Sequence, residues 1–231
     1  LVGKMVHALD ELGLRERTII IFATDNGTVS SLSGTMRGQK VVGGKSSTEE
    51  PGICVPFIVN CPGLVPAGKT TALGDLTDIL PTCAQIGGAE LPGQYTVDGT
   101  SLMEVFLGKS ADSPRKWIMA MGGDGNGSKA ALSPVGMENE YRFRDRVVRD
   151  KSHKLYVSSD RKPVKLVLMT DGTEGTDNLL ESPDAQHVAA YRKLWSAVEL
   201  FPEQDADPHY VPLARQPWDT QITVASQTWK K

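Results

Sequence analysis

Residues 18–28 of the chain read TIIIFATDNGT, an apolar run that ends abruptly in Asp25-Asn26-Gly27. The run from Thr18 to Ala23 is β-branched and aromatic, which predicts a strand buried on both faces. A helix is expected just before it, over residues 1–13, because apolar residues recur there at helical spacing. A helix that leads into such a strand over a short loop predicts an α/β layered fold.

A second apolar run, Val55–Cys61, ends at Pro62-Gly63 and predicts another buried strand. Between the two strands, residues 27–53 are rich in Gly, Ser and Thr and show no periodicity, which predicts a long loop. Loops of this length in compact domains are usually functional or disordered. We therefore place the function of the chain between Thr18 and Pro62.

The character of the sequence changes near residue 112. A helix is expected over residues 75–87, and later segments predict a strand from Lys116, a hairpin that turns at 150–152, a strand near 166–169 and a helix over 184–200. We therefore assign residues 1–112 to an α/β part and residues 113–231 to a small antiparallel module of sheet and helix.

Composition excludes several classes of protein. The chain has 231 residues, a net charge of −3, 39% hydrophobic residues and 23% charged residues, which is ordinary for a globular protein. The acidic balance, without a basic cluster, argues against nucleic-acid binding. No stretch approaches the roughly 20 apolar residues that span a bilayer. Cys54, Cys61 and Cys83 form neither a disulfide framework nor a zinc motif and are expected to be buried thiols.

Asp25 and Asn26 stand where the first strand runs out into a loop. In open α/β sheets, ligands collect outside the carboxyl ends of the strands. A carboxylate beside an amide oxygen suits Ca²⁺ or Mg²⁺ better than zinc. Asp, Asn and Gly are also residues that commonly form turns without any ligand. On these residues alone, both interpretations stay open.

Lys45 lies in the run Gly43-Gly44-Lys45-Ser46-Ser47. A nucleotide-binding loop does not fit, since five residues separate Gly38 from Gly44 and that motif needs four. A lysine on a glycine-rich loop can still act as a point charge for a tetrahedral oxyanion. The alternative is a solvated loop lysine.

Taken in order, these segments resemble the sulfatase family of the alkaline phosphatase superfamily. The segment ALDELGLRERTIIIFATDNG (8–27) resembles the family's stretch that ends in its Asp-Asn-Gly metal site, and Lys45 with SSTEEPGICVPFIVNCPG (46–63) resembles its Gly-Lys, Glu-Gly-Gly and Val-Pro-Phe signature. Four later segments also match in order: DLTDILPTCAQIGG (75–88), VDGTSLMEVFLG (97–108), RVVRDKSHKLYV (146–157) and LVLMTDGTEGTDNLLESP (166–183).

The resemblance implies an α/β fold, an incomplete alkaline-phosphatase-like mixed sheet with flanking helices plus a small C-terminal antiparallel α+β module. It also implies hydrolysis of a sulfate monoester. Asp25 and Asn26 match the positions that bind the active-site divalent cation, usually calcium. Lys45, five residues before Glu50, matches the lysine that contacts the sulfate ester. Lys40 is the second candidate for that contact.

The family's nucleophile is a formylglycine hydrate, made from the first residue of a Cys/Ser-x-Pro-x-Arg motif. The run Cys54-Val55-Pro56-Phe57-Ile58 begins like this motif but has Ile58 in place of Arg, and no other stretch fits. The resemblance therefore implies that the chain is the C-terminal portion of a sulfatase and that the formylglycine belongs to an N-terminal part. The chain alone is predicted to hydrolyse sulfate esters poorly or not at all.

The implied partner is a sulfate-ester small molecule or a sulfated glycan. Exposed strand edges in the α/β part predict self-association, as a homo-oligomer, or pairing with an N-terminal half. Two alternatives stay open. One is a phosphodiesterase or phosphonate hydrolase of the same superfamily, which would share Asp25 and Asn26. The other is a non-catalytic binding module.

Overall fold

A computed structural model describes residues 1–36, 38–91, 93–94, 96–122, 131–133, 136–138 and 144–203. Its α-helices are α1 (Val2–Glu11), α2 (Glu50–Ile53), α3 (Ile79–Ile86), α4 (Met103–Phe106) and α6 (Ala185–Val198). Its strands are β1 (Ile20–Ala23), β2 (Ser33–Met36), β3 (Gln39–Val42), β4 (Phe57–Asn60), β5 (Ile118–Met121), β6 (Ala131–Ser133), β7 (Gly136–Glu138), β8 (Arg146–Arg149), β9 (His153–Val157), β10 (Pro163–Thr170) and β11 (Thr173–Glu174).

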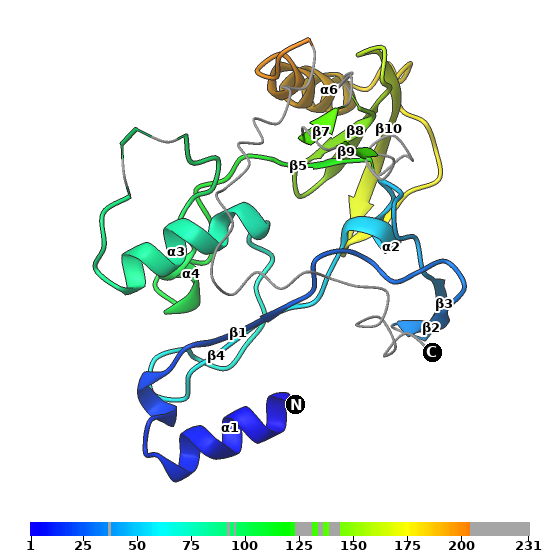
Figure 1. Cartoon of the computed structure of the whole chain (residues 1–231). Coiled ribbons are helices and arrows are strands. Elements are labelled where there is room, and N and C mark those ends of the chain that lie inside the picture. Colours follow the sequence, from blue (N-terminus) through cyan, green and yellow to red (C-terminus); the bar gives the residue numbers. More distant parts are fainter. Residues whose placement is uncertain are drawn as a thin grey trace.

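The main core lies between a five-stranded antiparallel sheet and α6, which covers one face of that sheet (Figure 1). The strand order is β11-β10-β9-β8-β5. Alternate residues of the central strands point at the helix, as the two-residue period of a strand requires. Burying each large apolar side chain here contributes about 1.5–3 kcal/mol. The core residues are Val148, Leu155, Val157, Leu166, Leu194, Ala197 and Val198.

The hairpin and the last helix expected from the sequence are confirmed. β8 pairs with β9, and the Asp150 carboxylate closes their turn by accepting hydrogen bonds from the backbone N–H groups of Ser152 and His153, each at 2.8 Å. The Asp184 carboxylate caps the start of α6 by accepting a 2.7 Å hydrogen bond from the Gln186 N–H. Short polar side chains therefore set both boundaries.

The expectation that the first two strands are buried on both faces is wrong. β1 and β4 form an antiparallel pair of their own, with Phe22 38% exposed and Ile58 56% exposed. Among the described residues no third strand joins this pair. An apolar run shows that a strand can be buried, but only the elements packed against it decide whether it is.

The long loop expected over residues 27–53 is also wrong in part. It contains the β2–β3 hairpin, in which Gly34 lies opposite Val41, and the short helix α2. Gly38 adopts a φ of +78° in the turn of this hairpin, a conformation that glycine takes without steric cost. A four-residue strand in a Gly/Ser-rich stretch offers too little alternation to be recognised from sequence.

A buried carboxylate anchors the helix expected over residues 75–87. Asp78 is fully buried and accepts hydrogen bonds from the Asp75 N–H at 2.9 Å, the Thr100 N–H at 2.7 Å and the Arg115 Nε at 2.8 Å. Asp75 caps a 3₁₀ turn that leads into α3, and Pro81 lies in the first turn of α3, where proline is tolerated. Asp78 thus links α3 to the segment that leads into β5.

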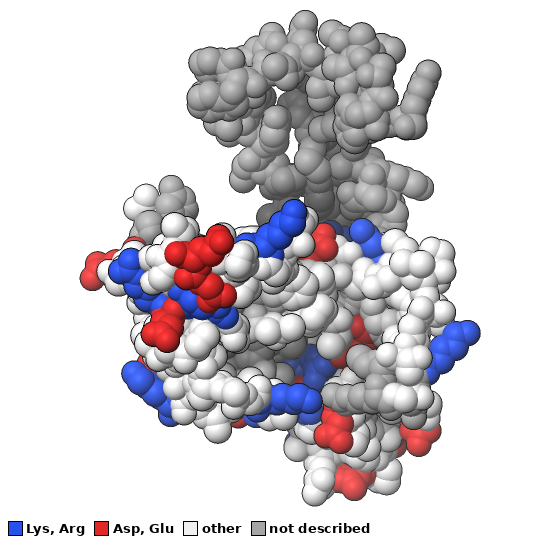
Figure 2. All heavy atoms as spheres, turned by 90° about the horizontal axis from the view of Figure 1, so that it is seen from below, with Lys and Arg blue, Asp and Glu red and all other residues white. Residues whose placement is uncertain are grey.

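The α/β fold class is confirmed, and every strand pair among the described residues is antiparallel. The division near residue 112 and the self-association remain predictions. Cys61 is buried as expected, whereas Cys54 and Cys83 are exposed. On the face drawn in Figure 2, acidic and basic side chains are scattered among uncharged ones. No helix in the described ranges has the length and apolar character needed to cross a membrane.

His153 makes the stability of the sheet sensitive to acid. The residue is 6% exposed, its ring lies 5.5 Å from that of His187 between centroids, and its Nε2 is buried without a hydrogen-bond partner. Burial, with His187 and Lys193 nearby, lowers the pKa of His153 below 6.5, although Asp150 acts to raise it. The fold therefore favours the neutral ring.

Because the unfolded chain binds more protons in this range, the free energy of unfolding is expected to fall as pH drops below about 6.5. His153→Gln cannot titrate, so this part of the pH dependence should disappear in urea denaturation measured from pH 7.5 to 5. His7→Gln is the control, since His7 is exposed and pairs, within the described ranges, with the exposed Glu11. An unchanged pH dependence in His153→Gln would contradict this account.

Candidate functional site

The two loops that carry the predicted site residues lie against each other. The Gly27 N–H donates to the Gly52 carbonyl at 2.8 Å, and the Lys45 N–H donates to the Thr28 carbonyl at 2.9 Å. The Asp-Asn-Gly loop and the Gly-Gly-Lys loop are therefore joined by backbone hydrogen bonds. Asp25 and Asn26 directly precede Gly27, which makes the first of these bonds. Lys45 itself makes the second.

Glycine is required where these backbones meet. A Cβ on Gly27 would lie 2.0 Å from the Pro51 carbonyl oxygen, one on Gly43 would lie 2.2 Å from that of Val29, and one on Gly52 would lie 2.3 Å from that of Ser47. Real Cβ atoms do not approach backbone oxygens so closely, so any larger residue would push the loops apart. The glycine content of residues 27–53 therefore reflects close packing.

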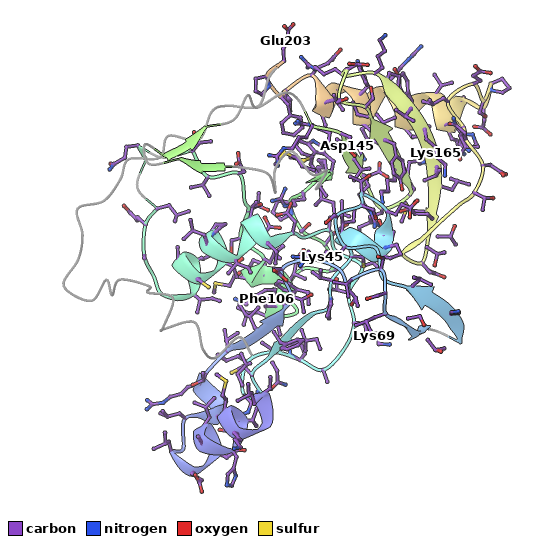
Figure 3. All side chains as sticks on the ribbon, turned by 45° about the vertical axis from the view of Figure 1, so that its right-hand side comes forward. Lys45, Lys69, Phe106, Asp145, Lys165 and Glu203 are labelled. Atoms are coloured by element: carbon purple, nitrogen blue, oxygen red, sulfur yellow. The ribbon has the colours of Figure 1, made fainter. Side chains whose placement is uncertain are left out.

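Lys45 is exposed and lies beside α2 (Figure 3). Its neighbour Ser46 has a φ of +77°, a left-handed conformation that costs a non-glycine residue about 1–3 kcal/mol and occurs often at functional sites. The Ser47 N–H closes the turn by donating to the Gly44 carbonyl at 2.9 Å. Lys40, by contrast, lies on β3 opposite Thr35, in a hairpin that projects away from α2 (Figure 1).

Asp25 and Asn26 offer the oxygen atoms that a hard cation prefers. Asp25 is exposed and Asn26 is half-buried, and the Asn26 N–H donates to Asp25 Oδ1 at 3.0 Å. Their donor chemistry fits Ca²⁺ or Mg²⁺, but calcium takes 6–8 oxygen ligands. Within the described part of the chain, no group of three or more His, Cys, Asp or Glu side chains could hold a metal ion. These two residues therefore fit one side of a cation site.

The Cys54 thiol is not set up as a nucleophile. The surrounding atoms desolvate it, and this effect, followed by the charge of the nearby Glu50 carboxylate, raises its pKa above 9.0. A cysteine nucleophile needs a thiolate, which a raised pKa disfavours.

Glu50 links α2 to the five-stranded sheet, a role that the sequence analysis did not foresee. Its Oε1 accepts from Lys154 Nζ at 3.1 Å, and its Oε2 accepts from Arg149 Nη1 at 3.0 Å. Its backbone N–H donates to Glu174 Oε1 at 2.8 Å. The partners lie about 100 residues away in sequence, so no local pattern could have revealed them.

Comparisons with known proteins show which family the chain resembles. Residues 1–89 match the family described as Sulfatase. The chain is therefore similar to the sulfatase family over this segment. It is 35% identical to mouse (Mus musculus) steryl-sulfatase over 125 residues, which are 51% of this chain and 20% of that protein. It is 37% identical to human (Homo sapiens) arylsulfatase A over 121 residues, which are 50% of this chain and 22% of that protein.

Solved structures show a similar fold over most of the chain. The structure of Ps i-CgsB superimposes with a TM-score of 0.61 and 24% identity, over 85% of this chain and 40% of that one, and it has also been solved in complex with k-i-k-neocarrahexaose. The phosphonate monoester hydrolase SpPMH from Silicibacter pomeroyi gives a TM-score of 0.58 and 20% identity, over 86% of this chain and 37% of that one. The chain spans less than half of the length of each of these relatives.

Gly27→Ala should separate the two loops, because its methyl group would collide with the Pro51 carbonyl. We expect destabilisation of about 1–3 kcal/mol, typical of backbone strain, and faster amide exchange at Lys45. Denaturant unfolding and hydrogen exchange measure both effects. Gly68→Ala is the control, since a Cβ there would meet nothing within 4 Å. Equal effects of the two substitutions would contradict the close packing inferred here.

Proposed function

We propose that this chain forms one side of a site that hydrolyses a sulfate monoester. Lys45 contacts the sulfate group, and Asp25 with Asn26 binds a divalent cation, Ca²⁺ or Mg²⁺. The observation that carries the proposal is the pair of backbone hydrogen bonds that joins the two loops. Because of these bonds, segments about twenty positions apart in the sequence lie against each other.

Each residue has a distinct role in this proposal. The Lys45 ammonium binds a non-bridging sulfate oxygen and stabilises charge that develops on the ester during hydrolysis. Its exposure leaves it accessible to a ligand. The Asp25 carboxylate and the Asn26 amide oxygen would hold the cation. When bound, that cation would neutralise the equatorial sulfate oxygens by Lewis-acid attraction.

The proposed partner is a sulfate ester, either a small molecule or a glycan. The matched relatives include proteins named for steryl and aryl sulfates, and a fold neighbour has been solved with an oligosaccharide. The formylglycine nucleophile belongs, in this proposal, to a part of the enzyme outside these 231 residues. An N-terminal half that carries the formylglycine would then complete the site.

Phosphonate or phosphodiester hydrolysis is the second candidate, supported by the fold shared with a phosphonate monoester hydrolase. The Asp25-Asn26 pair suits both chemistries, because both transition states carry charge on non-bridging oxygens. The five-residue spacing from Lys45 to Glu50 favours the sulfatase. A non-catalytic binding module would keep the cation and anion contacts without turnover.

Lys45→Ala should weaken the binding of inorganic sulfate at least tenfold, as expected from losing a hydrogen bond from a charged group worth about 1.5–3 kcal/mol. Amide NMR titration of the chain, with and without Ca²⁺, measures the affinity and shows which residues shift. We expect shifts at residues 25–28 and 43–47, with Asp25→Ala abolishing only the Ca²⁺ response. Parallel titration with phenylphosphonate tests the second candidate.

Lys40→Ala and Lys69→Ala are the matched controls, since both lysines are exposed and lie outside the joined loops. Their sulfate affinity should equal that of the unmodified chain. A loss with Lys40→Ala but not with Lys45→Ala would move the sulfate contact to the β2–β3 hairpin. Equal losses of sulfate affinity in all three variants would show that the affinity depends on net charge and not on a particular lysine.

The 231-residue chain should hydrolyse p-nitrophenyl sulfate no faster than buffer, because Ile58 occupies the position where the formylglycine motif needs Arg. Release of p-nitrophenolate, followed by absorbance, measures the rate. Turnover well above the buffer rate, abolished in Lys45→Ala, would show that the chain carries a complete site.

A further inference from the structure

Two carboxylates and two cations meet beneath α2. Lys154 is 0% exposed, and its Nζ lies 3.1 Å from Glu50 Oε1 and 2.5 Å from Glu174 Oε1. Arg149 binds the other oxygen of Glu50 at 3.0 Å, and the Tyr156 hydroxyl donates to Glu174 Oε2. We call these four charged residues, Glu50, Arg149, Lys154 and Glu174, the buried charge cluster.

The five-stranded sheet presents this cluster on the face opposite α6. Leu155 and Val157 of β9 point into the core, so Lys154 and Tyr156, which alternate with them, point the other way. Arg149 lies directly opposite Lys154 in the β8–β9 pair. Glu50 comes from α2 and is the only member of the cluster outside the sheet. The cluster is therefore the contact that ties α2 to this face.

The net charge of the buried charge cluster is zero. Two positive and two negative groups cancel, and each ion gains partners that replace its lost hydration. Burial acts to raise the pKa of Glu174, but the hydrogen bonds from Lys154 and then Tyr156 outweigh it, and the pKa is lowered. Glu174 therefore stays ionised at neutral pH. Removing one member would leave another charge buried without its partner.

Holding Glu50 also holds the two loops of the proposed sulfate site. Glu50 begins α2, and the Gly52 carbonyl of the same helix accepts the hydrogen bond from Gly27. Gly52 also packs against the carbonyl oxygens of Ser47 and Gly44, the residues on either side of the Lys45–Ser46 turn. A shift of α2 would therefore move both Lys45 and the Asp25-Asn26 loop.

We propose that Arg149, Lys154 and Glu174 are positioning residues which, through Glu50, hold Lys45 and the Asp25-Asn26 loop in register for a sulfate ester. The identity of the ligand rests on the proposed function, whereas the mechanical coupling does not. The five-stranded sheet then does more than pack against α6, because it sets the geometry of a site to which it contributes no ligand contact.

Lys154→Met tests the coupling, because it keeps an unbranched side chain only one atom shorter and removes the charge. Hydrogen exchange should accelerate at least tenfold at the amides of Gly27, Lys45 and Cys54, whose hydrogen bonds run to Gly52, Thr28 and Glu50. Amides in the β9–β10 ladder should keep their protection. Lys151→Met is the matched control, since Lys151 lies in the turn of the same hairpin and, among the described residues, its ion pair is an exposed one with Asp112.

A double-variant cycle separates positioning from general stability. If Lys154 acts through Glu50, Glu50→Gln combined with Lys154→Met should accelerate loop exchange no more than Lys154→Met alone. Sulfate affinity should fall at least fivefold in Lys154→Met and stay unchanged in Lys151→Met. Should Lys154→Met fail to fold, Glu174→Gln removes a charge while keeping the hydrogen bond to Tyr156, and the same loop amides are followed.

Unchanged loop exchange in a folded Lys154→Met or Glu174→Gln chain would overturn the proposal, as would additive effects in the cycle. Equal acceleration across the whole sheet would also overturn it, because that pattern is loss of stability without specific coupling. If the unmodified chain binds no sulfate, the proposed function fails, but the exchange measurements still decide whether the cluster positions the loops.

Discussion

The contact between Glu50 and the five-stranded sheet is the constraint on which the placement of the site depends. Apolar contacts are non-directional and tolerate small shifts. The Glu50 carboxylate tolerates few such shifts, because its lost hydration is replaced by hydrogen bonds from Lys154 and Arg149 that hold only in one position. α2 is therefore held at one position on the sheet, although it has only four residues. A helix this short has no stability of its own.

The loops around Lys45 are held in place through that contact. Lys45 and Ser46 are exposed, and Ser46 adopts a left-handed conformation, so neither residue stabilises the turn by burial. Order comes from the hydrogen bonds of Gly27 and Lys45 and from glycines that let the backbones touch. Such an arrangement leaves the lysine side chain accessible while its backbone is fixed. A group that must meet a charged ligand benefits from both properties.

Different parts of the chain play different roles in the sulfatase fold. The β1–β4 pair carries the Asp-Asn-Gly loop but leaves apolar side chains such as Ile58 exposed. The sheet under α6 is fully packed and contains the main core. The site therefore stands between a well-packed support and a pair of strands whose outer faces stay open. Its geometry depends on the support, and its predicted chemistry lies in the loops.

The sequence by itself determined the fold class, the resemblance to sulfatases, the β8–β9 hairpin with its turn at 150–152, and the helix over 184–200, because each leaves a local or ordered pattern. It also singled out Asp25, Asn26 and Lys45 as site candidates, on resemblance. Only the tertiary structure decided that β1 and β4 are part-exposed, that the two loops are bonded together, and that Lys154 is buried. A lysine between His153 and Leu155 in a strand has the pattern of a solvent-facing residue. Its burial depends on a carboxylate about 100 residues earlier, and no local pattern records such a contact.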